Sequence, residues 1–468
     1  MIKSNKFIAF VLVLGWATTN AQESQSFSLE EAISYGLKHN YQVQQANLDV
    51  DISKSKVKET TAIGLPQVNA EASFNDFINI PVQVAPADAF GFPDWMVQTL
   101  AISAMQNGVD IPPTDPDAVS EFQFGQKYSA SAGVTASQLL FDGSYFVGLK
   151  AAREYVAFSE LGAERTESEV KTSISKTYIN AIAAQENIKA LEDNKANIEQ
   201  IYEETSKFFE VGFLEKQDAD QVKLLKSNIT YQLDYANRQY ESILNLLKFQ
   251  IGMPVTESIT LTDNIETLVE MGSEEALALM SEQFSAKNHV DFRTLEQSER
   301  LSELSLSNAR AGYYPQLSAF ISHTENAYRD EFDFLSGGSW FPTTVWGVQL
   351  KMPIFSSGMR FQKAKQAKLE LAKTVSQKTM LEQSLNMQAI NAASDYKSAL
   401  ERHAVVSDDL DLAKSIKETT RTKFNEGIST SNDLTQAESQ YLTTLGNYIN
   451  TTIELLNAKL NLMTAYGK

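Results

Sequence analysis

The sequence predicts a mainly α-helical protein with a smaller part made of membrane-type β-strands. One structural unit occurs twice in it. Landmark residues recur at a fixed spacing: Gly212 and Gly427 lie 215 positions apart, and so do Gly252 and Gly467. Each half of the chain also contains two segments that alternate between polar and apolar residues, followed by a very long segment without proline. A duplicated unit that joins a strand pair to a long helical hairpin accounts for these observations.

The first 21 residues predict a secretory signal peptide. Lys3 and Lys6 precede a short apolar run, and the small residue Ala21 follows it. This order of a basic start, an apolar core and a small-residue cleavage site is typical of such peptides. The apolar run is shorter than the roughly 20 residues that a membrane-spanning helix needs. No later stretch reaches that length, so we expect no transmembrane helix.

Composition excludes several classes of protein. The chain has no cysteine, which rules out disulfides, thiolate metal sites and a cysteine-linked lipid anchor. Its formal net charge of −19 disfavours nucleic-acid binding, since phosphates repel an acidic surface. Because only 21% of the residues are charged and 43% are hydrophobic, the chain is not a disordered acidic protein.

The first repeat is expected to span residues 22–260. After a capping box that begins at Ser28 and helices that end before Pro66, two strands are predicted at about 66–76 and 127–138. Val68 and Phe74 belong to the apolar face of the first strand. Each strand is about 10 residues long, the length of a tilted transmembrane strand. Between them lies a long proline-rich loop, 80–122, with a short helix near 95–104.

A long helical hairpin follows the second strand, over residues 144–252, and Gly212 separates its two helices. Apolar residues of the second helix recur at alternating steps of three and four, which predicts a coiled-coil seam. The seam consists of Ala219, Val222, Ile229, Leu233, Ala236, Tyr240, Ile243 and Leu247, with Lys226 as its polar exception.

The second repeat is expected to span residues 261–468. Its strands are predicted at about 315–325 and 342–355, and its helical hairpin at 358–467, with Gly427 between the helices. Adding 215 to each seam position of the first repeat gives the seam of the last helix: Leu434, Ala437, Tyr441, Thr444, Tyr448, Thr451, Leu455, Ala458 and Leu462. The packing register was therefore duplicated together with the sequence.

Four strands of membrane length do not suffice to close a barrel, because the smallest transmembrane barrels have eight. An open sheet edge in lipid would leave backbone groups without hydrogen bonds, at a cost of several kcal/mol each. If the strands lie in a membrane, other copies of the chain must therefore complete the sheet.

Taken together, these segments resemble the TolC-type outer-membrane efflux protein family, over essentially the whole chain after the signal peptide. The matching pieces are Leu65-Pro66-Gln67 and Tyr314-Pro315-Gln316, Leu140-Phe141-Asp142-Gly143 and Pro353-Ile354-Phe355, and the two turns from Val211 to Asp218 and from Glu426 to Asp433. The order, spacing and duplication of these pieces carry the resemblance.

The resemblance implies a homotrimer in the outer membrane. Three chains would form a 12-stranded β-barrel in outer-membrane lipid that continues into an α-helical tunnel in the periplasm. The family acts as a passive exit duct of efflux or secretion systems. A periplasmic adaptor (membrane fusion) protein and an energised inner-membrane transporter of the RND or ABC type complete such systems.

The resemblance also assigns candidate site residues. The hairpin turns would dock the adaptor through Gly212, Phe213, Gly427 and Ile428. The closed end of the tunnel would be lined by Asp433, Gln436 and Asp218, with Gln436 standing where the family often has a second acid. An aromatic girdle at the membrane interface would consist of Trp340, Phe341 and Trp346. Each set also has a structural explanation, as turn formers, helix-dipole partners or packing residues.

No enzyme is expected. The four histidines are scattered without metal-ligand spacing, no glycine-rich phosphate loop is present, and no cofactor is implied. The alternative to a channel is a periplasmic coiled-coil structural or adaptor protein without a membrane barrel. That alternative explains the helices but leaves the four alternating strands without a role.

Overall fold

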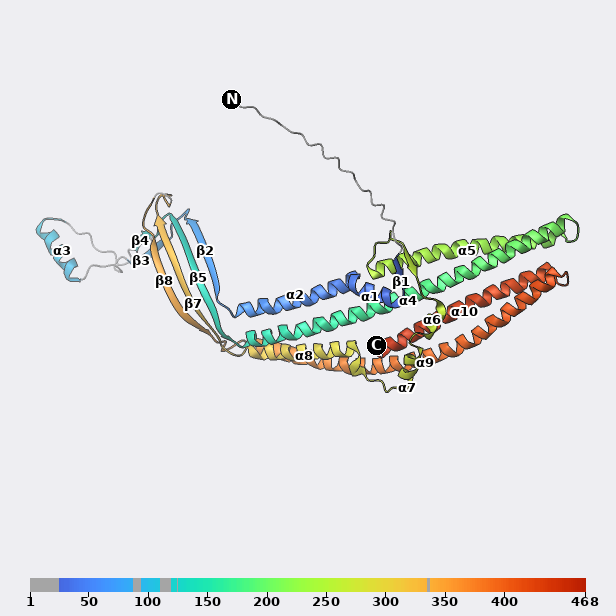
Figure 1. Ribbon diagram of the computed structural model, residues 1–468. Helices are drawn as coiled ribbons and strands as arrows, with labels where there is room; N and C mark the ends of the chain where they lie inside the picture. The colour runs from blue at the N-terminus through green and yellow to red at the C-terminus, as the bar shows by residue number, and fades with distance from the viewer. Residues whose placement is uncertain (1–24, 87–93, 110–118, 124, 335–336) are drawn as a thin grey trace, which may run out of the picture. The chain divides into compact units, whose positions relative to one another are not determined.

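The computed structural model describes residues 25–86, 94–109, 119–123, 125–334 and 337–468 (Figure 1). The predicted signal peptide, residues 1–21, lies outside these ranges, as do parts of the 80–122 loop. The described chain divides into two compact units. A helical unit contains residues 25–55, 153–303 and 367–468, and a sheet unit contains 56–152 and 304–366, less the gaps given above. Each unit draws on both sequence halves, so the division into two repeats stays a prediction.

The long helices and the four long strands follow one another in the predicted order, and several short elements that the sequence did not predict lie between them. In the first half they are β1 (Gln25–Phe27), α1 (Leu29–His39), α2 (Tyr41–Ile63), β2 (Gln67–Asp76), β3 (Val82–Pro86), α3 (Asp94–Gln106), β4 (Val119–Gln123), β5 (Tyr128–Asp142), α4 (Gly143–Glu210) and α5 (Lys216–Ile251). In the second half they are β6 (Ile259–Leu261), α6 (Ile265–Glu270), α7 (Ser273–Ser281), the 3₁₀ turn η1 (Ala286–Asn288), α8 (Val290–Ala311), β7 (Gln316–Arg329), β8 (Phe341–Lys351), α9 (Met359–Asn425) and α10 (Ser431–Ala465). A mainly α fold with two strand pairs and two long hairpins is confirmed.

The sheet of the sheet unit has the order β2-β5-β7-β8, with every neighbouring pair antiparallel (Figure 1). β5 and β7 extend further than predicted. β8 ends at Lys351 rather than near 355, because Pro353 has no backbone N–H for the ladder. Within the described residues β2 pairs only with β5 and β8 only with β7, so both outer edges of the sheet are unpaired.

The two faces of this sheet differ sharply in polarity. One row across the strands is Val68, Ala136, Ile321 and Trp346, and the side chains of Val68, Ile321 and Trp346 are 67%, 52% and 77% exposed. The opposite face carries hydrogen-bonded hydroxyls, such as Ser73 with Ser131 at 2.8 Å and Thr135 with Ser322 at 2.8 Å. The sheet thus has a mainly apolar and a mainly polar face, because successive side chains of a strand point to opposite faces.

Several helix ends are closed by capping residues that the sequence predicts. At α1, Glu31 N–H donates to Ser28 Oγ at 3.4 Å, and Ser28 N–H donates to Glu31 Oε2 at 2.8 Å, so the predicted capping box is confirmed. At the C-terminal end of α5, Gly252 adopts φ +79 and ends the helix. An added Cβ there would lie 2.2 Å from the backbone oxygen of His39, so only glycine fits.

The core of the helical unit lies where α1 and the short parallel pair β1–β6 pack against α4, α5 and α10. Ile174, Tyr178 and Ile251 are fully buried there. The hydroxyl of Tyr178 donates to the backbone oxygen of Phe27 at 2.9 Å, which satisfies its polar atom. The seams predicted for α5 and α10 are largely buried, including Val222, Ile229, Leu247, Leu434, Leu455 and Leu462.

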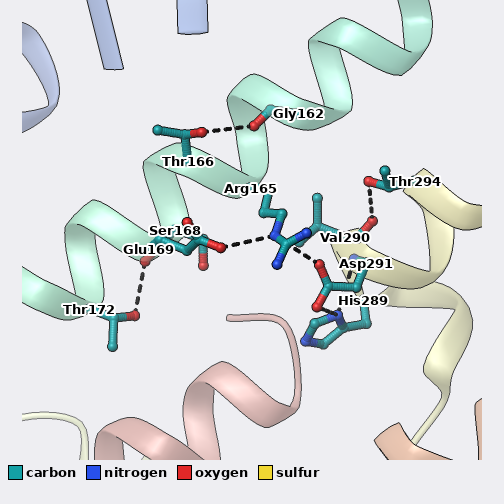
Figure 2. Close-up of polar contacts among 10 residues, drawn as sticks. All are labelled: Gly162, Arg165, Thr166, Ser168, Glu169, Thr172, His289, Val290, Asp291 and Thr294. Atoms are coloured by element: carbon teal, nitrogen blue, oxygen red, sulfur yellow. Dashed lines mark hydrogen bonds and ion pairs between the residues drawn. The ribbon is translucent and has the colours of Figure 1, made fainter. Parts of the chain in front are cut away.

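A polar cluster connects α4 to the beginning of α8 (Figure 2). Arg165 Nε donates to Glu169 Oε1 at 2.9 Å on its own helix and lies 3.2 Å from Asp291 Oδ1 on α8. Asp291 N–H donates to His289 Nδ1 at 3.2 Å, which orients the largely buried imidazole. Arg165 therefore bridges two elements far apart in sequence.

Within the described ranges, no long helix is apolar enough to cross a bilayer.

Candidate functional site

The two hairpin turns have the same backbone geometry. Gly212 and Gly427 adopt φ +83 and φ +73, and a Cβ added to either meets nothing within 4 Å. After each glycine, the next N–H closes the turn: Phe213 N–H donates to Phe208 O at 2.9 Å, and Ile428 N–H donates to Lys423 O at 2.8 Å. Both glycines are therefore needed for a left-handed helix end rather than for space.

Each turn exposes one large apolar side chain. Phe213 is 79% exposed and Ile428 is 71% exposed. These are the residues expected to dock an adaptor, and exposed apolar groups at a turn favour a protein contact. Their role in docking stays a prediction.

The residues predicted to line the tunnel end have different environments. The carboxylate of Asp433 accepts from Thr430 N–H at 3.0 Å and from Ser429 Oγ at 3.1 Å. Hydrogen bonds from Thr430, and then from Ser429, lower the pKa of Asp433. The side chain of Gln436 is exposed and makes no hydrogen bond within the described residues. Asp433 therefore caps its own helix in the isolated chain.

Asp218, by contrast, connects the two hairpins. Its Oδ1 accepts a hydrogen bond from the hydroxyl of Ser431, the first residue of α10. The same hydroxyl lies 3.0 Å from Oε1 of Gln221 on α5. Ser431 is buried although it lies next to the exposed turn. Sequence reasoning did not identify Ser431, since no local pattern signals a contact between residues that are 213 positions apart.

Arg421 makes a second connection between the hairpins. Its guanidinium donates from Nη1 to Asn197 Oδ1 at 2.9 Å and from Nη2 to Gln200 Oε1 at 3.4 Å, joining α9 to α4. Together with Ser431–Asp218, it holds the ends of the two hairpins against each other. We call Ser431, Asp218, Gln221 and Arg421, with the partners of Arg421, the hairpin link.

A buried charged layer lies next to the hairpin link. Glu438 on α10 is 0% exposed, and within the described residues neither of its carboxylate oxygens makes a hydrogen bond of ordinary geometry, although the amide of Asn194 is close enough to oppose the rise in its pKa. Lys417 on α9 lies 4.0 Å from Glu438 Oε2 and 3.9 Å from the ring centroid of Tyr441. Burial raises the pKa of Glu438, against the opposing effect of Lys417, and burial lowers the pKa of Lys417. Each group is therefore pushed towards its neutral form.

The predicted girdle residues do not share one face of the sheet. Trp346 lies on the apolar face opposite Ile321. Phe341 lies on the polar face, since it pairs with Asn326 and is an odd number of residues from Trp346. Trp340 precedes β8 and packs edge-on against Phe334, with ring centroids 6.4 Å apart. A membrane-interface role for these three residues stays a prediction.

A cluster of three polar side chains interrupts the apolar face. His323 Nδ1 lies 2.7 Å from Thr344 Oγ1, and His323 Nε2 lies 3.6 Å from Glu325 Oε1. Polar side chains on such a surface usually pair with one another. Elsewhere, the described residues hold no group of three or more histidine, aspartate or glutamate side chains arranged for a metal ion.

The family model of the outer membrane efflux proteins matches residues 283–468. The outer membrane protein TolC of Vibrio cholerae is 24% identical over 357 residues, which cover 72% of this chain and 76% of that protein. A probable efflux pump outer membrane protein, TtgC of Pseudomonas putida, is 23% identical over 329 residues. That alignment covers 70% of this chain and 61% of TtgC, less than two thirds of its length.

Solved structures show the same fold. The CmeC outer membrane channel of Campylobacter jejuni superposes with a TM-score of 0.68 at 18% identity, covering 94% of this chain and 85% of CmeC. The outer membrane protein VceC of Vibrio cholerae superposes with a TM-score of 0.65 at 15% identity, covering 94% and 96%. At these identities the likeness establishes the fold.

Proposed function

The chain belongs to the family of TolC-type outer-membrane efflux proteins, and from this premise we propose that it is a passive exit duct for solutes. One observation supports the proposal most strongly. A single four-stranded sheet has an exposed apolar face, a hydrogen-bonded polar face and two unpaired edges. Such a sheet is stable in a membrane only if other copies pair with its edges and lipid covers its apolar face.

We propose a trimer in the outer membrane, with its helical part in the periplasm. Three copies of the four strands give the 12-stranded barrel of the family, in which β2 of one chain pairs with β8 of the next. The hydroxyl-rich face would then line the lumen. A closed ring pairs every edge, whereas an open array leaves two edges unpaired. Two copies would also close a barrel of eight strands, and the resemblance to the family favours three.

Adaptor docking is proposed for the two hairpin turns, through Phe213 and Ile428. Changing both residues to glutamate should abolish efflux in cells, because charge disfavours burial in a protein contact. Channel conductance of the purified double variant should stay unchanged. A matched control is Leu224→Glu, which alters a residue on α5 that is 71% exposed but lies outside the turn. Normal efflux by the double variant would exclude these turns as the docking site.

The hairpin link is proposed to keep the tunnel end narrow. Opening would require α9 and α10 to move away from α4 and α5, which breaks the contacts of Ser431 and Arg421. The experiment is single-channel conductance in planar bilayers. The wild type should give stable conductance steps, and Ser431→Ala combined with Arg421→Ala should increase their size. Ser439→Ala, on the same helix and exposed, should leave the step size unchanged.

Each outcome of this measurement is decisive. A purified protein without any conductance would contradict the duct itself. Conductance that is equal in the wild type and the double variant would leave the duct intact but exclude the hairpin link as its constriction. An inner-membrane transporter is the proposed energy source, since the chain offers no nucleotide-binding loop.

A further inference from the structure

The helical unit contains an apolar pocket that takes no part in the proposed duct function. It has a volume of about 360 Å³ and is lined by α1, α4, α6, α7 with the segment between them, and α10. Ile179, Leu268 and Leu456 form its floor and are 3%, 3% and 2% exposed. Leu29, Ile33, Leu460 and Met463 form its partly buried walls. A mainly apolar concave lining of this size is typical of sites for small molecules.

A buried cation contributes to the lining of the pocket. Lys459 is only 6% exposed, and its Nζ donates to three backbone oxygens: Leu268 at 2.8 Å, Val269 at 3.2 Å and Met271 at 2.6 Å. Among the described residues no carboxylate forms an ion pair with it. Burial lowers the pKa of Lys459 to about 8, so the ammonium form still dominates at pH 7. Its positive charge is therefore solvated by carbonyl dipoles but not neutralised.

The rim of the pocket adds further positive charge. Lys171 on α4 lines the opening, and its ammonium group has no hydrogen bond or ion pair within the described part of the chain. Lys468 lies 3.7 Å from Glu275, and Glu30 completes the charged lining. Lys468 is also 4.0 Å from Glu282, so its charge is balanced by carboxylates, and Lys171 and Lys459 are the two lining lysines without a carboxylate partner among the described residues. An anion is thus favoured here although the protein as a whole repels anions.

We propose that this pocket binds a medium-chain aliphatic carboxylate, with its tail over Ile179 and Leu456 and its carboxylate against Lys171. The apolar floor supplies the area that an alkyl chain buries. The unpaired ammonium of Lys171 supplies a charge-assisted hydrogen bond, and the nearby charge of Lys459 adds attraction. An alkylamine of equal length meets the same lysines and is repelled, and an alcohol gains the burial but not the charge. The site lies outside the hairpin link, so its occupancy is separate from conduction.

The experiment is a calorimetric titration of the full mature protein with octanoate at pH 7. The protein is held in amphipol after detergent removal, because micelles would absorb the ligand. Octanol and octylammonium, which have the same chain length, are titrated in parallel. Octanoate should bind saturably, octanol at least about tenfold more weakly, and octylammonium without measurable saturation, since about 1.4 kcal/mol of charge interaction corresponds to a tenfold change.

Two variants and one control localise the binding. Lys171→Ala should weaken octanoate binding about tenfold, the usual scale for losing a hydrogen bond to a charged group. Met463→Trp should abolish binding by filling the pocket from its wall. Lys189→Ala removes an exposed lysine of the same helix outside the pocket and should change nothing. Far-UV circular dichroism of each variant confirms that the fold is retained.

Several results would overturn the proposal. These are the absence of saturable octanoate binding to the folded wild type, equal affinity for octanoate and octanol, and unchanged binding to folded Met463→Trp. Conductance measured on the same preparation distinguishes a failure of the duct proposal from a failure of the pocket proposal. Binding without conductance would count against the duct alone, and conductance without binding would count against the pocket alone.

Discussion

The two hairpins contain the same lysine–tyrosine pair with the residues exchanged. In the first hairpin, Tyr202 lies on α4 and Lys226 on α5, with Nζ 5.0 Å from the ring centroid. In the second hairpin, the equivalent positions hold Lys417 on α9 and Tyr441 on α10, with Nζ 3.9 Å from the ring centroid. Each pair of equivalent positions is 215 residues apart. The contact between cation and ring thus occurs in both hairpins, with its two members on opposite helices.

The surroundings of the two lysines differ, and so does the direction of their pKa shifts. Lys226 forms an ion pair with Glu199 at 2.8 Å, and the hydrogen bond of that pair raises the pKa of Lys226. Lys417 is largely buried beside Glu438, and burial lowers the pKa of Lys417. The two hairpins therefore share this contact geometry, but exposure to solvent determines the electrostatics in each hairpin.

The largest expected effect tests whether the two seams contribute equally to packing. Ile229 is 0% exposed in the first seam, and its equivalent in the second is the partly buried Thr444. Ile229→Ala should reduce the local stability of the first hairpin by about 3 kcal/mol, through lost burial and a cavity. Thr444→Ala should cost less than about 1 kcal/mol, since it removes much less buried volume. Hydrogen exchange of peptides covering 195–235 and 410–450 measures both. Equal losses would contradict the difference in burial.

The second largest expected effect concerns the stability contribution of the buried pair Glu438 and Lys417 in the second hairpin. The pKa of Glu438 is raised from its ordinary 4.5 in the folded state, so its contribution to stability is complete below about pH 4.5 and is lost as the pH rises through the raised pKa. The lowered pKa of Lys417 acts in the opposite sense, with its contribution present above 10.5 and lost on acidification. Both groups are thus least favourable near neutral pH.

Glu438→Gln should therefore stabilise the protein by about 1 kcal/mol at pH 8, because glutamine stays neutral and avoids the cost of ionising a buried carboxyl. It should leave stability at pH 4.5 nearly unchanged, because the carboxyl is largely protonated there. Thermal unfolding at the two pH values measures the difference. Lys223→Gln, at the equivalent exposed position of the first hairpin, serves as the control and should change little. A loss of stability at pH 8 would mean that the pair with Lys417 is net favourable.

The smallest expected effect tests whether the two hairpin turns have the same backbone geometry. Gly212→Ala and Gly427→Ala should each cost about 1 kcal/mol, because both glycines adopt positive φ without any steric contact. Gly162→Ala, in the interior of α4 and also without steric contact, should instead stabilise by up to about 1 kcal/mol. Hydrogen exchange at the turns measures these values. Clearly unequal costs at Gly212 and Gly427 would contradict the shared geometry.

Local chemistry made much of the fold predictable. Pro66 and Pro315 mark where helices give way to strands, and Gly212 and Gly427 mark the hairpin turns. The alternation around Val68 indicates a two-faced strand, and the three-and-four spacing of the seam indicates the packed side of α5. Each of these signals lies within a few residues, which is why the order of the long elements could be read directly.

Contacts between distant segments could not be read in this way. The pair β1–β6 joins Phe27 to Leu261 through strands of only three residues each. Ser431 contacts Asp218, and Lys459 contacts the carbonyls at the C-terminal end of α6, without any sequence pattern that signals either contact. Asp218 and Asp433 look alike in sequence, yet one joins the hairpins and the other caps its own helix. Such differences arise from tertiary packing, which the local propensities of the sequence do not determine.

The central claim, that three chains share one membrane sheet, is tested most directly by the mass of the particle extracted from washed outer membranes. The chain has a mass of 52.0 kDa. The account predicts a stable particle of about 150 kDa of protein, consistent with closed threefold symmetry. A monomer or dimer recovered in the soluble periplasmic fraction would contradict it, since the exposed apolar face and the two free edges of the sheet would then have no partner.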